Sequence, residues 1–130
     1  MSTIQIITVG VFAAAGAILR YLLTILYPFN YSVFNGILLA NIIGCFLMGI
    51  LFFVASELDI LSQSVKLGLI VGFLGSFTTF SAFGGYFFEF IQNKFYAKAF
   101  MHVSITMTAT LLSVLVGWLI ASSLFSRFFN

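Results

Sequence analysis

Long apolar segments separated by short polar ones run through the whole sequence. Asp, Glu, Lys and Arg are absent from residues 1–19, 21–56, 67–88 and 99–126. An α-helix needs about 20 mainly apolar residues to cross a bilayer. Segments of this length therefore predict an all-α membrane protein.

The second of these segments is long enough for two helices. Residues 27–32, Tyr-Pro-Phe-Asn-Tyr-Ser, divide it and are typical of a turn at the membrane interface. Polar turns are also expected at 56–59 and 92–94. We predict one domain, residues 1–130, with four spans near 4–26, 33–55, 66–92 and 97–125. The first span has no basic segment before it and is expected to stay in the mature protein.

Composition excludes a soluble globule. Hydrophobic residues make up 62% of the chain and charged residues 6%, whereas soluble domains have about 25% charged residues. Membrane lipid is therefore an expected partner. The net charge of +2 includes no basic patch, so no nucleic-acid partner is expected. Cys45 stands alone and is expected to serve packing.

Basic residues are divided almost evenly between the two ends of the predicted helices. Lys66 and Arg127 fall on the side of the termini, whereas Lys94, Lys98 and Arg20 fall toward the other side. Positive residues favour cytoplasmic loops, so this balance gives little preference for one orientation. Four helices also have little room to enclose a pore. A dual-topology, antiparallel homodimer is one hypothesis that fits both points, and a single orientation with a weak bias is the alternative.

Residues 72–85 are unusual for the middle of a membrane helix. They read Gly-Phe-Leu-Gly-Ser-Phe-Thr-Thr-Phe-Ser-Ala-Phe-Gly-Gly, and glycine, serine and threonine weaken a helix. We predict that the third helix is broken near its centre, between Gly75 and Thr79. Backbone groups at such a break are tolerated where they are buried, line a wet cavity or bind an ion. A kink with satisfied hydrogen bonds is the alternative.

Aromatic and amide groups near the predicted break are candidates for an anion pathway. Phe80 and Phe83 are three residues apart and share one helix face. Aromatic ring edges are electropositive and hold an anion loosely. Asn41 interrupts the second span with an amide, which bonds another helix or faces a polar path.

The fourth span has polar residues at four-residue spacing. His102, Thr106 and Thr110 form one row on a helix face and are a candidate ion relay. Ser104 and Thr108 form a parallel row, which indicates that part of this polarity serves helix packing alone.

These motifs together resemble the Fluc (CrcB) family of fluoride channels. The resemblance rests on Gly72-x-x-Gly75-x-x-Thr78-Thr79-Phe80-Ser81-x-Phe83, on Arg20 at the end of the first span, and on Asn41 in Ala40-Asn41-x-x-Gly44. It extends over nearly the whole chain, in length, number of spans and order of motifs.

The resemblance implies a fluoride-selective channel that passively exports cytoplasmic fluoride and protects against its toxicity. It implies two pores in an antiparallel homodimer, and a structural sodium ion at the dimer interface, held by the backbone carbonyls of Gly75 and Thr78. The implied location is the plasma membrane of a prokaryotic cell, crossed several times. The implied pathway residues are Phe80, Phe83, Asn41, Ser81, Thr79, His102, Thr106 and Thr110, with Arg20 at a vestibule or as a structural anchor.

Two positions depart from the family pattern. Ser76 follows Gly75 where the family often has a second glycine, so the backbone is less free. Tyr86 stands where the family tends to have a glutamate, and that glutamate's role is not transferred to Glu89.

Other function classes fit the sequence less well. A small proton-coupled exporter needs a titratable group within a span, and only His102 lies deep enough. A structural subunit of a larger complex would use small residues such as Gly36, Ala40 and Gly44, but leaves residues 72–83 unexplained. An enzyme is the least supported class, because the sequence has no paired carboxylates, Cys/His dyad or metal-ligand cluster.

Overall fold

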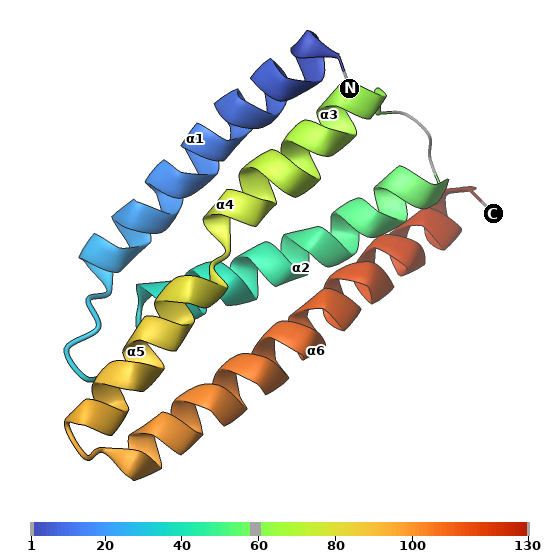
Figure 1. The fold of residues 1–130 in the computed structure, drawn as a ribbon. Helices are drawn as coiled ribbons and strands as arrows, with labels where there is room; N and C mark the ends of the chain where they lie inside the picture. Colours follow the sequence, from blue (N-terminus) through green and yellow to red (C-terminus); the bar gives the residue numbers. More distant parts are fainter. Residues whose placement is uncertain (1, 58–60, 130) are drawn as a thin grey trace.

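The computed structural model describes residues 2–57 and 61–129, with side chains up to residue 126. Within these ranges the chain forms helices and connecting turns and no strand. Leu58 and Asp59, part of the predicted turn at 56–59, lie outside the described residues. The elements, drawn in Figure 1, are α1 (Thr3–Leu26), α2 (Gly36–Glu57), α3 (Gln63–Leu67), η1 (Gly68–Leu74), α4 (Gly75–Phe77), α5 (Phe80–Gln92) and α6 (Tyr96–Phe129).

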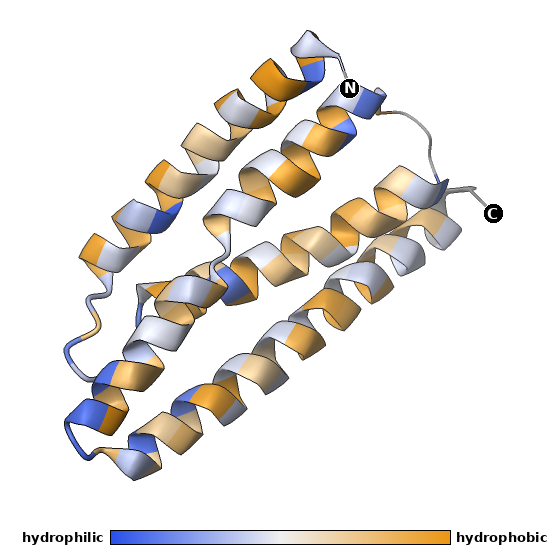
Figure 2. Cartoon of the chain, in the orientation of Figure 1, coloured by the Kyte–Doolittle hydropathy of each residue, from blue (hydrophilic) through white to orange (hydrophobic). Residues whose placement is uncertain are grey.

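Four helical stretches of the described chain are long and apolar enough to cross a membrane. They are Thr3–Leu26, Gly36–Glu57, Gln63–Gln92 and Tyr96–Ser126. Figure 2 shows apolar residues along each of them and strongly hydrophilic residues gathered where α5 meets α6. The prediction of an all-α protein with four apolar, membrane-length helices is confirmed.

The turn between α1 and α2 is built by the residues that interrupt the apolar pattern. Asn30 and Tyr31 have positive φ angles of 38° and 53°, a conformation that asparagine adopts more readily than most residues. Oδ1 of Asn35 then accepts hydrogen bonds from the N–H groups of Ile37 and Leu38. These bonds cap α2 and fix its start.

Glycines set the closest approaches between helices. A Cβ at Gly49 on α2 would collide with the backbone carbonyl of Val114 on α6, and a Cβ at Gly16 on α1 would collide with the carbonyl of Phe73 on η1. Small residues allow helix backbones to approach this closely in a bilayer. The chain thus packs α2 against α6 and α1 against η1.

The third helical stretch departs from α-helical geometry at two places along its length. Gly68–Leu74 is π-helical, with wider turns than an α-helix. α4 ends at Phe77 and α5 begins at Phe80. Between them Thr78 (φ −81°, ψ 153°) and Thr79 (φ −152°, ψ 124°) are extended. Figure 1 shows this two-residue link as a short non-helical connection between α4 and α5.

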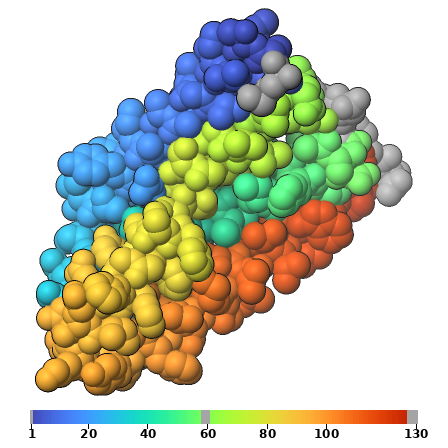
Figure 3. All heavy atoms as spheres, viewed as in Figure 1, coloured from blue at the N-terminus to red at the C-terminus, as the bar shows by residue number. Residues whose placement is uncertain are grey.

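All four helical stretches reach the surface. On the face shown in Figure 3, none of them is enclosed by the others. Many large apolar side chains of α1 are exposed, among them Ile4, Val11, Ile18 and Leu22. The part of the chain that the structure describes therefore encloses no wide interior.

Candidate functional site

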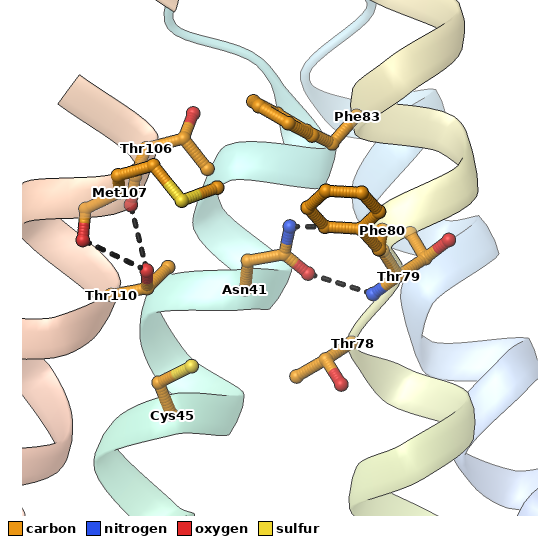
Figure 4. Close-up of a pocket in the computed structure, with 9 residues that line it drawn as sticks. All are labelled: Asn41, Cys45, Thr78, Thr79, Phe80, Phe83, Thr106, Met107 and Thr110. Atoms are coloured by element: carbon orange, nitrogen blue, oxygen red, sulfur yellow. Dashed lines mark hydrogen bonds between the residues drawn. The ribbon is translucent and has the colours of Figure 1, made fainter. Parts of the chain in front are cut away.

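A groove of about 190 Å³ lies beside the two extended threonines. Residues from α2, the Thr78–Thr79 link, α5 and α6 point toward it from different sides (Figure 4). Every residue that lines it is uncharged. The lining residues are Asn41, Cys45, Thr78, Thr79, Phe80, Phe83, Thr106, Met107 and Thr110.

The groove gathers most of the predicted pathway residues from three spans. Ser81 and His102 are the two that do not line it. The hydroxyl oxygen of Ser81 instead lies 3.0 Å from Oγ1 of Thr79, in an exposed contact. Thr78, predicted for the sodium site, also lines the groove, and Cys45 and Met107 line it without having been predicted as site residues. Cys45 lies one turn after Asn41 on the same face of α2, and this spacing was the available signal.

The amide of Asn41 holds the backbone of Thr79. Oδ1 of Asn41 accepts a hydrogen bond from the Thr79 N–H at 2.8 Å, and Nδ2 donates to the Thr79 carbonyl at 3.2 Å. Figure 4 shows this amide directed from α2 toward the link. In a continuous α-helix the Thr79 N–H would instead bond to the carbonyl of Gly75. Asn41 therefore supplies partners that the extended backbone lacks.

Thr79 also begins α5. Its Oγ1 accepts a hydrogen bond from the N–H of Ala82 at 3.3 Å, so the side chain caps the helix that starts at Phe80. A capped start gives Phe80 and Phe83 fixed positions on the first turn of α5. The cap thus connects the extended link to the direction of the two aromatic rings.

Phe80 and Phe83 form the aromatic wall of the groove. Their ring centroids are 5.2 Å apart with planes inclined by 45°. Phe83 is only 6% exposed, whereas Phe80 is 74% exposed although it lines the groove. One side of the groove is therefore open.

His102 lies behind Phe83. The side chain is fully buried, its Nε2 lies 3.2 Å from the carbonyl oxygen of Phe83, and its ring stacks on the Phe83 ring at a centroid distance of 4.8 Å. Because a carbonyl only accepts hydrogen bonds, Nε2 is the donor. His102 thus contacts the groove through Phe83.

Thr106 and Thr110 line the groove from α6, but their hydroxyl groups differ. Oγ1 of Thr110 donates to the backbone carbonyl of Thr106 at 2.7 Å, so this hydroxyl is bound to its own helix. Oγ1 of Thr106 is buried and has no hydrogen-bond partner among the described residues, and the same is true of Nδ1 of His102. Buried polar atoms in proteins nearly always have a partner, so Oγ1 of Thr106, which lines the groove, is a candidate to contact a passing ligand.

Arg20 joins α1 to the segment just before the link. Its Nε donates to the carbonyl of Ser76 at 3.0 Å. This bond uses a carbonyl near the end of α4, where helical partners are lost. Arg20 thus has one hydrogen bond of the kind that a structural anchor would make, and its partner Ser76 was not predicted from the sequence.

The two carbonyls predicted to hold sodium lie on either side of the end of α4. The Thr79 N–H bonds to Asn41, so the carbonyl of Gly75 loses its usual helical donor. Thr78 turns both its N–H and its hydroxyl to the carbonyl of Leu74, at 2.9 and 2.8 Å. No hydrogen bond of the described residues at this break uses the carbonyl oxygen of Gly75 or Thr78.

Comparison with known proteins identifies the family. The family model described as "CrcB-like protein, Camphor Resistance (CrcB)" matches residues 7–118. A relative named fluoride-specific ion channel FluC from Geobacter sulfurreducens is 35% identical, over 92% of this chain and 98% of its own length. Relatives with the same name come from Haemophilus ducreyi (36% identity, 93% of each chain) and Methanococcus aeolicus (31% identity, 87% of this chain and 91% of the relative). The resemblance found in the sequence motifs is confirmed: this multi-pass membrane protein belongs to the CrcB family.

Proposed function

We propose that this protein is a fluoride-specific ion channel and that the groove beside Thr78 and Thr79 is one wall of its pathway. The names of the relatives support fluoride as the ion. The observation that supports the groove as the pathway is its lining, which combines two phenylalanine rings, threonine side chains and an amide without any charged group.

Such a lining suits a small, strongly hydrated anion. Fluoride must exchange water for other partners as it enters the membrane, and it must be held weakly enough to leave again. Ring edges and hydroxyl or amide hydrogens provide partial positive charge without the full charge of Lys or Arg. The amide of Asn41 has a second N–H beyond the one that bonds Thr79. Conduction without trapping follows from many weak contacts.

The same groove gives little support to a proton-coupled exporter. No carboxylate lines it. Glu89, the acidic residue of α5, is exposed near the end of that helix. His102, the one deep candidate, is bonded to a backbone carbonyl behind Phe83. A passive pathway therefore fits the chemistry of the groove better than proton exchange.

The proposed channel is an antiparallel homodimer of dual topology. Phe80 lines the groove and yet is 74% exposed, so a second chain is needed to close the pathway. The even division of basic residues between the two ends permits opposite insertion of the two copies. Each copy contributes one groove, which gives two pores per dimer.

The proposed dimer also holds a structural sodium ion at its centre. Carbonyl oxygens at unwound membrane helices coordinate sodium in other transport proteins. The carbonyls of Gly75 and Thr78 fit this role, since the hydrogen bonds at the break leave both oxygens available. Two oxygens from each of two chains would provide the ligands, and the ion would join the copies where their links meet.

In a cell the channel would lie in the plasma membrane of a prokaryote and export fluoride. A membrane potential that is negative inside drives an anion outward by about 2.3 kcal/mol per 100 mV. Passive flow down this potential would protect the cell against fluoride. Relatives from bacteria and archaea agree with a prokaryotic setting.

Fluoride efflux from liposomes tests the proposal. Purified protein is reconstituted with internal potassium fluoride or chloride, and valinomycin starts the flow while an ion-selective electrode records each anion. We expect rapid fluoride efflux, little chloride efflux, and no need for a proton gradient. Absence of fluoride efflux from folded protein, or efflux only with a proton gradient, would contradict the channel assignment.

A further inference from the structure

We propose that His102 is a positioning residue that fixes Phe83 at the groove, an inference that rests on the proposed channel function. Two contacts join the residues. Nε2 of His102 donates to the Phe83 carbonyl at 3.2 Å, and the two rings stack at 4.8 Å with an interplanar angle of 29°. The first contact fixes the backbone of Phe83 and the second fixes its ring.

The surroundings of His102 prevent its ring from turning away. The side chain is fully buried, with the rings of Tyr86 at 6.4 Å and Phe90 at 5.6 Å between centroids. Both neighbours belong to α5, as Phe83 does. An imidazole enclosed in this way holds one orientation, and α5 is fastened to α6 at the residue that lines the groove.

The stacking also decides which part of Phe83 faces the groove. His102 covers one face of the Phe83 ring, and Phe83 is only 6% exposed. An anion is repelled by the face of an aromatic ring and attracted by its edge. A ring held by its covered face cannot swing freely, so the same part of Phe83 always meets the groove. The role of His102 is therefore to fix the orientation of the anion-binding surface.

The hydrogen bond fixes the tautomer of His102. Since the Phe83 carbonyl accepts, the neutral imidazole has its proton on Nε2 and leaves Nδ1 without one. This state can be observed directly, because His102 is the only histidine of the chain. When only histidine is labelled with ¹⁵N, every imidazole nitrogen signal in the NMR spectrum comes from His102.

Two substitutions test whether the hydrogen bond of His102, and not only its volume, is needed to position Phe83. His102→Gln keeps an N–H donor near the position of Nε2, whereas His102→Met fills similar volume without a donor. We expect fluoride efflux to fall at least about tenfold in His102→Met and to recover within about threefold of the parent in His102→Gln. Thr108→Val, an exposed position on the other polar row of α6, serves as the control and should leave efflux unchanged.

The experiment distinguishes failure of this inference from failure of the channel assignment. Fluoride efflux by the parent protein in the same vesicles tests the channel. If the parent conducts and His102→Met conducts equally well, or if the ¹⁵N spectrum shows the neutral ring protonated at Nδ1, the positioning role is refuted. If His102→Met does not fold, the NMR tautomer and the His102→Gln efflux still decide the question.

Discussion

Asn41 on α2 and Thr79 at the break of the third helical stretch are joined by two hydrogen bonds, one to each polar group of the Thr79 backbone. The residues are 38 positions apart in the sequence. A single amide suits this task because it donates and accepts at once. Replacing either function should disturb the link and the groove together.

Substitution of Asn41 by aspartate tests this relationship. In Asn41→Asp one carboxylate oxygen still accepts from the Thr79 N–H, but the other faces the Thr79 carbonyl, and two acceptors repel. We expect a loss of about 1–3 kcal/mol in the free energy of unfolding. Fluoride efflux should also fall, because the groove gains a negative charge. Denaturation in detergent and efflux from liposomes measure the two effects.

Asn93→Asp provides the matched control. Asn93 lies at the exposed end of α5, where its side chain bonds the Glu89 carbonyl, so the same change of charge occurs far from the groove. Its efflux should equal that of the parent. Parental stability and efflux in Asn41→Asp would show that neither hydrogen bond matters as described.

The aromatic wall is tested by isoleucine substitutions at Phe80 and Phe83. Isoleucine keeps an apolar side chain but has no electropositive ring edge. We expect each variant to lose most fluoride efflux. Phe83→Ile should also lose about 1–3 kcal/mol of stability because Phe83 is buried, whereas Phe80→Ile should lose less, because Phe80 packs against little of its own chain. Efflux and thermal melting distinguish these outcomes.

Phe88→Ile is the comparison for this pair. Phe88 lies on α5 and is exposed, but it does not line the groove. It should conduct as the parent does. Equal efflux in all three isoleucine variants would remove the phenylalanine rings from the pathway.

Thr106 offers a test in which stability and efflux should change in opposite directions. Its buried Oγ1 has no hydrogen-bond partner among the described residues, and such a group costs about 1–3 kcal/mol. Thr106→Val keeps the shape and removes this cost, so the protein should become more stable. If the hydroxyl contacts fluoride, efflux should fall at the same time. Thr106→Ser, which keeps a hydroxyl, should retain efflux, and a Val variant with full efflux would place the hydroxyl outside the pathway.

The sodium proposal predicts a stability that depends on the cation. Replacing sodium with N-methylglucamine at constant ionic strength should lower the melting temperature of the dimer, because a ligand that binds only the folded state stabilises it. Melting in a series of sodium concentrations measures this effect. Identical melting temperatures in both cations would argue against a bound sodium ion.

The hydrophobic pattern was sufficient to predict four apolar helices, because a bilayer demands about 20 apolar residues in each. It also placed Pro28 and Asn30 in a turn, since both residues have strong local preferences. The partners of Asn41 and Arg20 could not be predicted in this way. Their bonds to Thr79 and Ser76 depend on how distant helices pack, which no local pattern encodes.

The polar row on the fourth span shows that a local pattern also fails to give the surroundings of residues within one helix. His102, Thr106 and Thr110 were grouped as one row by their four-residue spacing. A helix turns by about 100° per residue, so each step of four rotates the side chain by about 40°. Four-residue spacing therefore does not guarantee common surroundings: Thr106 and Thr110 line the groove, whereas His102 lies behind Phe83.

Asn41 and Gly49 give α2 a second property, a fixed register. Asn41 is bonded to the link at Thr79, and Gly49, about two turns later, leaves room only for the carbonyl of Val114 on α6. Inserting one residue between them would rotate one contact by about 100° relative to the other, so only one could form. The spacing of eight positions between Asn41 and Gly49 thus sets how the break at Thr79 is aligned along the axis of α6.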